Sequence, residues 1–102
     1  MLMEKLRPHY ALPEIKQIVA RDGGRTFTFA AQRGAQSMGL SRAEAAAVVL
    51  ALTGTMFYKS MTTRTDSKLW QDVYHAPCPN GKIAYIKLTI QNGAVVIQFK
   101  EK

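Results

Sequence analysis

Apolar residues recur every three or four positions through the first half of the chain, which is the spacing of one helix face. The first run predicts a helix over Leu12–Arg21, with Pro13 in its first turn and Gly23 beyond its end. A second run predicts a helix over Phe29–Met38, which Gly39 closes as a C-terminal cap. The chain therefore begins with at least two helices.

The third predicted helix carries the clearest start signal. Ser41 and Glu44 form a capping box, in which each side chain accepts a hydrogen bond from a free backbone N–H group. The apolar run Ala45–Leu52 continues this helix, and Gly54 stops it. Residues 26–28 leave room for a short strand before the second helix.

After Gly54 the pattern changes to β-branched and aromatic residues that alternate with polar ones, which is typical of strands. Four strands are predicted, over residues 56–63, 69–76, 82–91 and 94–100. Because short turns join them, consecutive strands pair antiparallel. The order of helices and then strands predicts an α+β fold, with an antiparallel sheet of about four strands in the C-terminal half and the N-terminal helices packed on one face.

The turn Asn92-Gly93 favours a two-residue type I′ hairpin, and this turn fixes the register of the last two strands. Gln91 then faces Ala94. On one side of the hairpin the pairs are Ile90–Val95, Leu88–Ile97 and Ile86–Phe99, all of them apolar. On the other side they are Thr89–Val96, Lys87–Gln98 and Tyr85–Lys100. The register therefore places a tyrosine beside a lysine on the polar side.

The register of the first strand pair depends on the loop between them. If residues 64–68 form the loop, Thr63 faces Leu69 and Met61 faces Gln71. Lys59 and Gln71 then lie on one face, whereas a four-residue loop would separate them.

Length and composition predict one globular domain over residues 1–102, because 102 residues with 47% hydrophobic content can enclose a single core. Lys and Arg number 14 against 7 Asp and Glu, and the net charge of +7 points to a polyanionic partner. Charge alone proposes RNA, DNA or anionic lipid equally.

The chain shows no sign of secretion or of a membrane span. Cys78 is the single cysteine, so no intrachain disulfide forms, and residues 1–8 carry charges without an apolar run behind them. Ala45–Leu52 is the most apolar stretch and is far shorter than the ~20 residues of a membrane span. These features predict a cytoplasmic protein with no membrane partner.

A metal site and a base-stacking site are two interpretations that the sequence does not favour. His75 and Cys78 have a spacing that could hold a metal, but His9 is the only other histidine and no second ligand pair exists, so a zinc site is rejected. Trp70 is interpreted as a packing aromatic and not as a platform for stacking bases.

Three strings resemble the motility quorum-sensing regulator toxin family of toxin–antitoxin pairs. They are Phe57-Tyr58-Lys59-Ser60-Met61-Thr62-Thr63, Trp70-Gln71-Asp72-Val73-Tyr74 and the ending Phe99-Lys100-Glu101-Lys102. The resemblance covers the whole chain in length and element order, is strong from Phe57 onward and is weak in the helical half.

This resemblance implies a RelE-like ribonuclease toxin fold and an enzyme, an endoribonuclease or mRNA interferase. Such an enzyme cuts messenger RNA at GC-containing (GCU-like) sites without a metal or other cofactor and without the ribosome, which inhibits translation and growth. The implied partners are the mRNA substrate and a cognate antitoxin, with operator DNA contacted only through that antitoxin.

Carried over by position, the resemblance assigns catalytic roles to Lys59, Gln71, Tyr85 and Lys100. The turn at residues 77–81 is one residue longer than the corresponding turn of the family. Tyr85 is assigned by placing the extra residue within this turn. The expected RNA-binding positions are Tyr58, Met61, His75 and Lys87. Of these, His75 stands where a relative carries an arginine. Lys87 is included because it is expected on the same face of the sheet.

These residue types suit RNA cleavage without a metal, which needs a base for the 2′-hydroxyl, an acid for the leaving 5′-oxygen and cations around the phosphorane. Lys59, Lys87 and Lys100 on one face are expected to lower the pKa of one another, so that a lysine can also transfer a proton. Tyr85 could donate or accept a proton, and Gln71 could hold phosphate or a base edge by hydrogen bonds.

Two other interpretations remain open. The chain could be a non-catalytic basic module that binds RNA or DNA through the polar sheet face. It could also be an antitoxin-associated transcriptional co-regulator, which only tunes the DNA binding of its partner.

Overall fold

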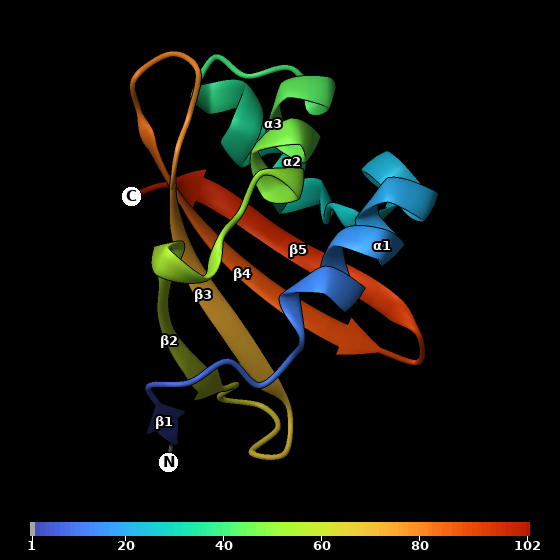
Figure 1. Ribbon diagram of the computed structural model, residues 1–102, viewed down its shortest axis with the longest axis vertical. Coiled ribbons are helices and arrows are strands. Elements are labelled where there is room, and N and C mark those ends of the chain that lie inside the picture. Colours follow the sequence, from blue (N-terminus) through green and yellow to red (C-terminus); the bar gives the residue numbers. More distant parts are fainter. Residues whose placement is uncertain (1) are drawn as a thin grey trace.

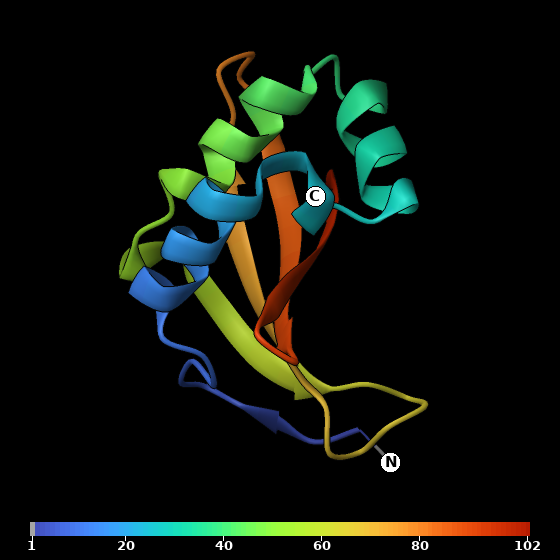
Figure 2. The same cartoon turned by 90° about the vertical axis from the view of Figure 1, so that its right-hand side faces the viewer.

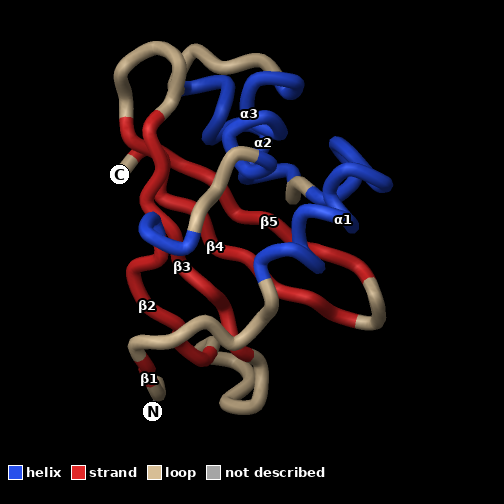
Figure 3. Tube along the Cα trace, viewed as in Figure 1, coloured by secondary structure: helices blue, strands red, loops and turns tan. Residues whose placement is uncertain are grey.

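The computed structural model describes residues 2–102, which form three α-helices and a five-stranded sheet (Figure 1). In chain order the elements are β1 (Glu4–Lys5), α1 (Leu12–Asp22), a 3-10 helix (Gly23–Thr26), α2 (Phe29–Ser37), α3 (Arg42–Leu50), a second 3-10 helix (Gly54–Met56), β2 (Phe57–Thr62), β3 (Trp70–Pro77), β4 (Ile83–Gln91) and β5 (Ala94–Glu101). Figure 3 shows the helices gathered beside one sheet. The predicted α+β class is confirmed.

Local signals at the helix ends explain why the three predicted helices form. The chain leaves α1 at Gly23, whose φ of 59° is one that glycine adopts without strain. The Thr28 hydroxyl caps α2 by accepting a hydrogen bond from the Ala31 N–H at 3.0 Å. The capping box of α3 is present, with Ser41 N–H donating to Glu44 at 2.9 Å and Glu44 N–H donating to Ser41 at 3.1 Å.

The sheet contains one strand more than the sequence pattern predicted. Its order is β1-β2-β3-β4-β5, and every neighbouring pair is antiparallel. The additional strand β1 has only two residues, which is too short to show an alternating pattern. The short strand expected at residues 26–28 is reduced to one parallel bridge between Phe27 and Ile97, because Thr26 belongs to the 3-10 helix.

Both predicted registers are confirmed. Asn92 and Gly93 have φ values of 52° and 75°, as a type I′ turn requires, and the pairs from Gln91–Ala94 to Tyr85–Lys100 are those predicted. Met61 pairs with Gln71, and Thr63 N–H donates to the Leu69 carbonyl at 3.0 Å, so residues 64–68 form the loop.

The core lies between one face of the sheet and the helices α1 and α3. It contains Ile15 and Val49 from the helices and Tyr74, Ile86 and Ile97 from the strands, all of them fully buried. Figure 2 shows α1 and α3 together on this side of the sheet, whereas α2 stands apart beside β5. The opposite side of the sheet carries the polar alternation and is called the polar face below.

Helix α2 lies against β5 at very close range. Thr28 N–H donates to the Ile97 carbonyl at 3.1 Å, so the segment before α2 bonds to the outer edge of β5. A Cβ atom at Gly34 would overlap the carbonyl oxygen of Phe99. Glycine is therefore required at this position for the helix to touch the strand backbone.

Gly34→Ala is expected to lower the free energy of unfolding by roughly 1–3 kcal/mol, because the added methyl group meets backbone that cannot move aside. Gly24→Ala is the matched control, since a Cβ at Gly24 meets nothing within 4 Å and its φ is not positive. Urea denaturation of both variants tests the expectation. Equal midpoints for the two variants would show that α2 does not depend on this contact.

Candidate active site

All eight residues proposed from the sequence lie on the polar face. They are Tyr58, Lys59, Met61, Gln71, His75, Tyr85, Lys87 and Lys100. They come from four adjacent strands, β2 to β5, whose registers set side chains next to one another across the sheet. The structure therefore brings all eight residues to one face, and their roles remain predictions.

The centre of the polar face is a row of two lysines with a valine between them. Lys59 pairs with Val73, and Val73 pairs with Lys87 on the next strand. Val73 is fully buried although α1 and α3 lie on the other side of the sheet. The aliphatic stems of its lysine neighbours can supply this cover while their amines stay at the surface.

A second row lies next to it and places aromatic rings against a lysine. His75 pairs with Tyr85, whose ring centroid is 5.4 Å away, and Tyr85 pairs with Lys100. The amines of Lys100 and Lys87 lie 5.4 Å and 6.0 Å from the Tyr85 ring centroid. Tyr85 thus has two cationic neighbours on the polar face.

Tyr58 reaches the polar face through a bulge. Strict alternation would put Phe57 and Lys59 on one side of β2 and Tyr58 on the other, but the register shifts between Phe57 and Lys59. The Phe57 ring therefore packs on the core residue Tyr74, at 5.5 Å between centroids. Tyr58 stacks on His75 at 4.5 Å instead. The bulge thus places Tyr58 and Lys59 together, a common use of bulges beside functional sites.

Two cavities open along the polar face. One of about 200 Å³ lies between α2 and the sheet and is lined by Ala30, Ala31, Gly34, Tyr85, Lys87, Gln98, Phe99 and Lys100. The other, of about 290 Å³, is lined by Leu2, Met61, Thr62, Thr63, Arg64, Thr65, Gln71, Lys87 and Gln98. Lys87 and Gln98 line both, so the two cavities are neighbours on the polar face.

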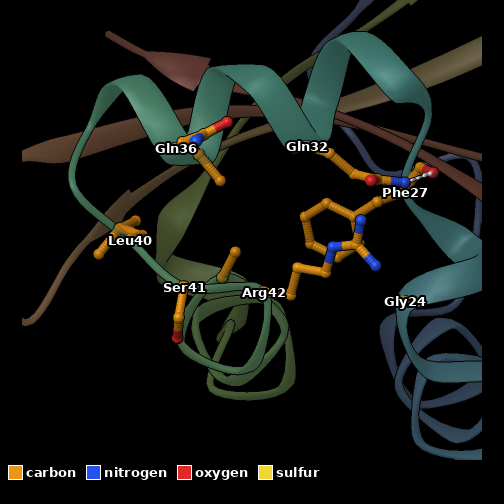
Figure 4. A pocket seen from close by; sticks show the side chains of 9 residues that line it. Gly24, Phe27, Gln32, Gln36, Leu40, Ser41 and Arg42 are labelled. Carbon is orange, nitrogen blue, oxygen red and sulfur yellow. Dashed lines mark hydrogen bonds between the residues drawn. The ribbon is translucent and has the colours of Figure 1, made fainter.

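A larger cavity of about 310 Å³ lies elsewhere, beside α2 and α3 (Figure 4). Its walls are Gly24, Phe27, Gln32, Ala35, Gln36, Leu40, Ser41, Arg42 and Ala45. None of the residues proposed from the sequence lines it. Arg42 is its one ionisable side chain, so the cavity offers no pair of groups for acid–base chemistry.

The lysines of the polar face do not share one electrostatic environment. Burial lowers the pKa of Lys87, and the nearby charges of Lys100 and Lys59 lower it further, as expected. For Lys59 the expectation of a lowered pKa was wrong. Its amine donates a hydrogen bond to the Glu4 carboxylate at 2.7 Å, and this contact raises the pKa of Lys59.

Lys87→Met is expected to raise the free energy of unfolding at pH 7 by roughly 0.5–1 kcal/mol, because methionine keeps the apolar stem without the repelled charge. The folded-state pKa of Lys87 is below its unfolded value, so protonation destabilises the folded chain at low pH. This penalty disappears as the pH rises from the folded pKa toward 10.5. Urea denaturation should therefore show that Lys87→Met is more stable than the unaltered chain at pH 7, and that this difference shrinks at higher pH. A variant that is less stable than the unaltered chain at pH 7 would contradict the expectation.

The His75 ring lies between Tyr58 and Tyr85, in surroundings that disfavour its charged form. Burial lowers its pKa, and the charge of Lys102 lowers it further. Its Nε2 atom is buried and has no hydrogen-bond partner among the described residues. The ring stacks on Tyr58 at 4.5 Å between centroids, and its role in RNA binding remains a prediction.

Trp70 lies on the side of β3 opposite Gln71 and packs against the N-terminal residues. The His9 ring stacks on it at 5.4 Å between centroids, and the Lys5 amine lies 4.3 Å from its ring centroid. This agrees with a packing role.

Across residues 2–102, no three His, Cys, Asp or Glu side chains gather in a group that could hold a metal ion.

The sequence comparisons give the family. The family described as "Motility quorum-sensing regulator, toxin of MqsA" matches residues 7–101. The chain belongs to this toxin family. Within it, the mRNA interferase toxin MqsR of Escherichia coli (strain K12) is 38% identical over 100 residues, which cover 98% of this chain and 100% of that relative. The predicted membership of the motility quorum-sensing regulator toxins is confirmed, and no helix in residues 2–102 is long and apolar enough to cross a membrane.

Proposed function

We propose that this toxin is an endoribonuclease that cleaves messenger RNA at GC-containing, GCU-like sites without a metal ion or the ribosome, and so inhibits translation and growth. The observation that carries the proposal is the polar face, where Lys87, Lys100, Tyr85 and Gln71 line two neighbouring cavities and Lys59 lies beside them, in register with Val73. The Escherichia coli relative, named an mRNA interferase toxin, supports the choice of substrate.

Lys59 and Lys100 have the chemistry to hold the reacting phosphate. They lie on strands β2 and β5 with β3 and β4 between them, so their amines approach an RNA backbone from two sides. Positive charge fixed around the phosphorane stabilises the transition state more than the ground state. Amines supply the charge that a metal ion supplies in other nucleases, which supports a mechanism without a metal.

Lys87 and Tyr85 are the candidates for proton transfer. The lowered pKa of Lys87 increases the fraction of neutral amine, which can accept the proton of the 2′-hydroxyl. Tyr85 lies beside both Lys87 and Lys100, where its hydroxyl can protonate the leaving 5′-oxygen. Gln71 has no acid or base function and positions the substrate through its amide.

The partners follow from the same family. We propose a cognate antitoxin of the MqsA kind, because the family description names the toxin of MqsA. Operator DNA would be contacted only through this antitoxin, and an mRNA substrate places the activity in the cytoplasm.

The test incubates the purified chain with a GC-containing RNA in the presence of EDTA and maps the new 5′ ends. Discrete ends at GC-containing sites are expected, and Lys100→Ala should form them roughly 10- to 100-fold more slowly. Lys16→Ala on α1 is the matched control and should cleave normally. RNA that is retarded on a gel but stays intact would favour the binding module instead.

Growth gives a separate test against the co-regulator alternative. Expression of the chain without its antitoxin should arrest growth, and co-expression of the antitoxin should restore it. Normal growth at a verified protein level would leave the co-regulator as the better interpretation.

A further inference from the structure

The amine of Lys59 is paired with a carboxylate from the far end of the sequence. Glu4 lies on β1, opposite Met61 of β2, and its carboxylate accepts the 2.7 Å hydrogen bond from Lys59. Among the described residues there are three ion pairs, and only this one contains a lysine of the polar face. Glu4 is therefore the carboxylate that the fold brings to the proposed active site.

Residues 3–10, called the N-terminal strap below, are anchored on the sheet at both ends. At one end, Met3 N–H donates to the Thr62 hydroxyl and Thr62 N–H donates to the Met3 carbonyl, both at 2.9 Å. At the other end, the N–H groups of His9 and Tyr10 donate to the Asp72 carboxylate at 2.9–3.0 Å. The strap thus has a fixed course, and Glu4 has a fixed place on it.

The anchor at Asp72 is built into the core of the sheet. Asp72 is fully buried, and it also accepts a hydrogen bond from the Ser60 hydroxyl at 2.6 Å. Tyr10 adds a hydrogen bond from its hydroxyl to the Trp70 carbonyl at 2.8 Å. A buried carboxylate with this many donors is a specific holding point for backbone. The position of Glu4 is therefore determined by contacts made outside the polar face.

The Glu4 contact opposes the effect of burial, which by itself lowers the pKa of Lys59. The ionisable groups facing Lys59 are Glu4 from β1, Tyr58 from β2 and both Tyr85 and Lys87 from β4. Without Glu4, burial would favour the neutral amine of Lys59. With Glu4 present, the hydrogen bond favours the ammonium form instead.

The pair leaves room for a substrate. An ammonium group has three N–H donors, and Glu4 occupies one of them, so two remain for phosphate oxygens. The Lys59 side chain is 23% exposed and that of Glu4 is 52% exposed, so both are accessible from solvent. Lys59 can therefore bind phosphate without leaving Glu4.

We infer that Glu4 is a positioning residue for the reaction proposed above. Glu4 holds the Lys59 amine protonated and in place, so that Lys59 is the fixed cation that binds phosphate. Lys87 and Tyr85 carry out the proton transfers. The inference rests on the proposed function. It gives two lysines of the polar face different roles. Lys59, which has a carboxylate partner, binds the negative charge of the phosphate, and Lys87, which has none among the described residues, exchanges a proton with the substrate.

The first measurement needs no RNA. The pKa of the Lys59 amine is followed by NMR titration of the full chain, with the resonance assigned through Lys59→Arg. Glu4→Gln is expected to lower this pKa, and Glu4→Asp should retain part of the effect. Glu101→Gln is the matched control, because Glu101 pairs with Lys82 at 3.6 Å away from the polar face. Glu4→Gln should leave the urea midpoint nearly unchanged, since exposed ion pairs contribute little to stability.

The second measurement is the pH profile of RNA cleavage. Glu4→Gln is expected to reduce kcat roughly 10- to 100-fold and to move the high-pH decline of kcat/KM to lower pH. Glu4→Asp should recover part of the rate. An unchanged pKa of Lys59 in Glu4→Gln would overturn the inference, and so would a lowered pKa with an unchanged cleavage profile. Absence of cleavage by the unaltered chain is a different result, because it removes the proposed function first and the inference with it.

Discussion

Lys59→Ala is expected to lower kcat/KM for RNA cleavage by roughly 10²- to 10⁴-fold, the range for one transition-state group. Lys59 is at the centre of the polar face, in register with Val73 and, through it, with Lys87. Removal of its amine also leaves Glu4 without its cation, so that an uncompensated negative charge faces the phosphate. Both effects act in the same direction.

Single-turnover cleavage of a GC-containing RNA measures this change. Lys82→Ala is the control, because Lys82 also pairs with a glutamate but lies outside the polar face. The control should cleave at the normal rate. A Lys59→Ala enzyme that retains most of its activity, while Lys82→Ala behaves normally, would remove Lys59 from the proposed mechanism.

Asp72→Ala is expected to lower the free energy of unfolding by roughly 3–5 kcal/mol, because several hydrogen bonds to one buried carboxylate are lost together. The change removes the acceptor for His9 N–H, Tyr10 N–H and the Ser60 hydroxyl, and leaves these donors unsatisfied. It also leaves a cavity at a fully buried position. Many domains of this size have little more stability than this to lose.

Urea denaturation followed by circular dichroism measures the loss. Asp22→Ala is the control. Asp22 pairs with the exposed Arg21 at the end of α1, so this substitution should leave the urea midpoint nearly unchanged. Asp72→Asn should fall between the two, because an amide oxygen still accepts part of the network. Similar midpoints for the Asp72 and Asp22 variants would show that the strap is not held by this carboxylate.

Much of the fold could be predicted from the sequence because its signals are local. The turn Asn92-Gly93 determines the last hairpin, and a slip by one residue would have exposed Leu88 and Ile97. The capping box at Ser41 likewise marks α3 within four residues of sequence. Such signals need no knowledge of distant contacts.

The features that were missed depend on residues far apart in the chain. β1 forms because Asp72 holds His9 and Tyr10, the residues that follow β1 in the chain. These residues come about sixty positions before Asp72 in the sequence. No alternation in two residues could indicate this strand. For the same reason, nothing near Glu4 in the sequence indicates that it meets Lys59.

The bulge in β2 is a second case, because period-two alternation assumes an unbroken ladder. That assumption gives the correct face for Lys59 and Met61 but the wrong one for Tyr58. The family resemblance had grouped Tyr58 with Met61, and the shift of register between Phe57 and Lys59 provides the physical reason.

The contact between α2 and β5 also bears on the solubility of the chain. Strands that end a sheet carry unpaired backbone groups, and a second molecule can add to them in a growing aggregate. Here the segment from Phe27 to Gly34 occupies that border of β5 through the Ile97 bridge and the close approach at Phe99. A substitution at Gly34 that pushes α2 away is thus expected to expose the edge of β5 to a second molecule.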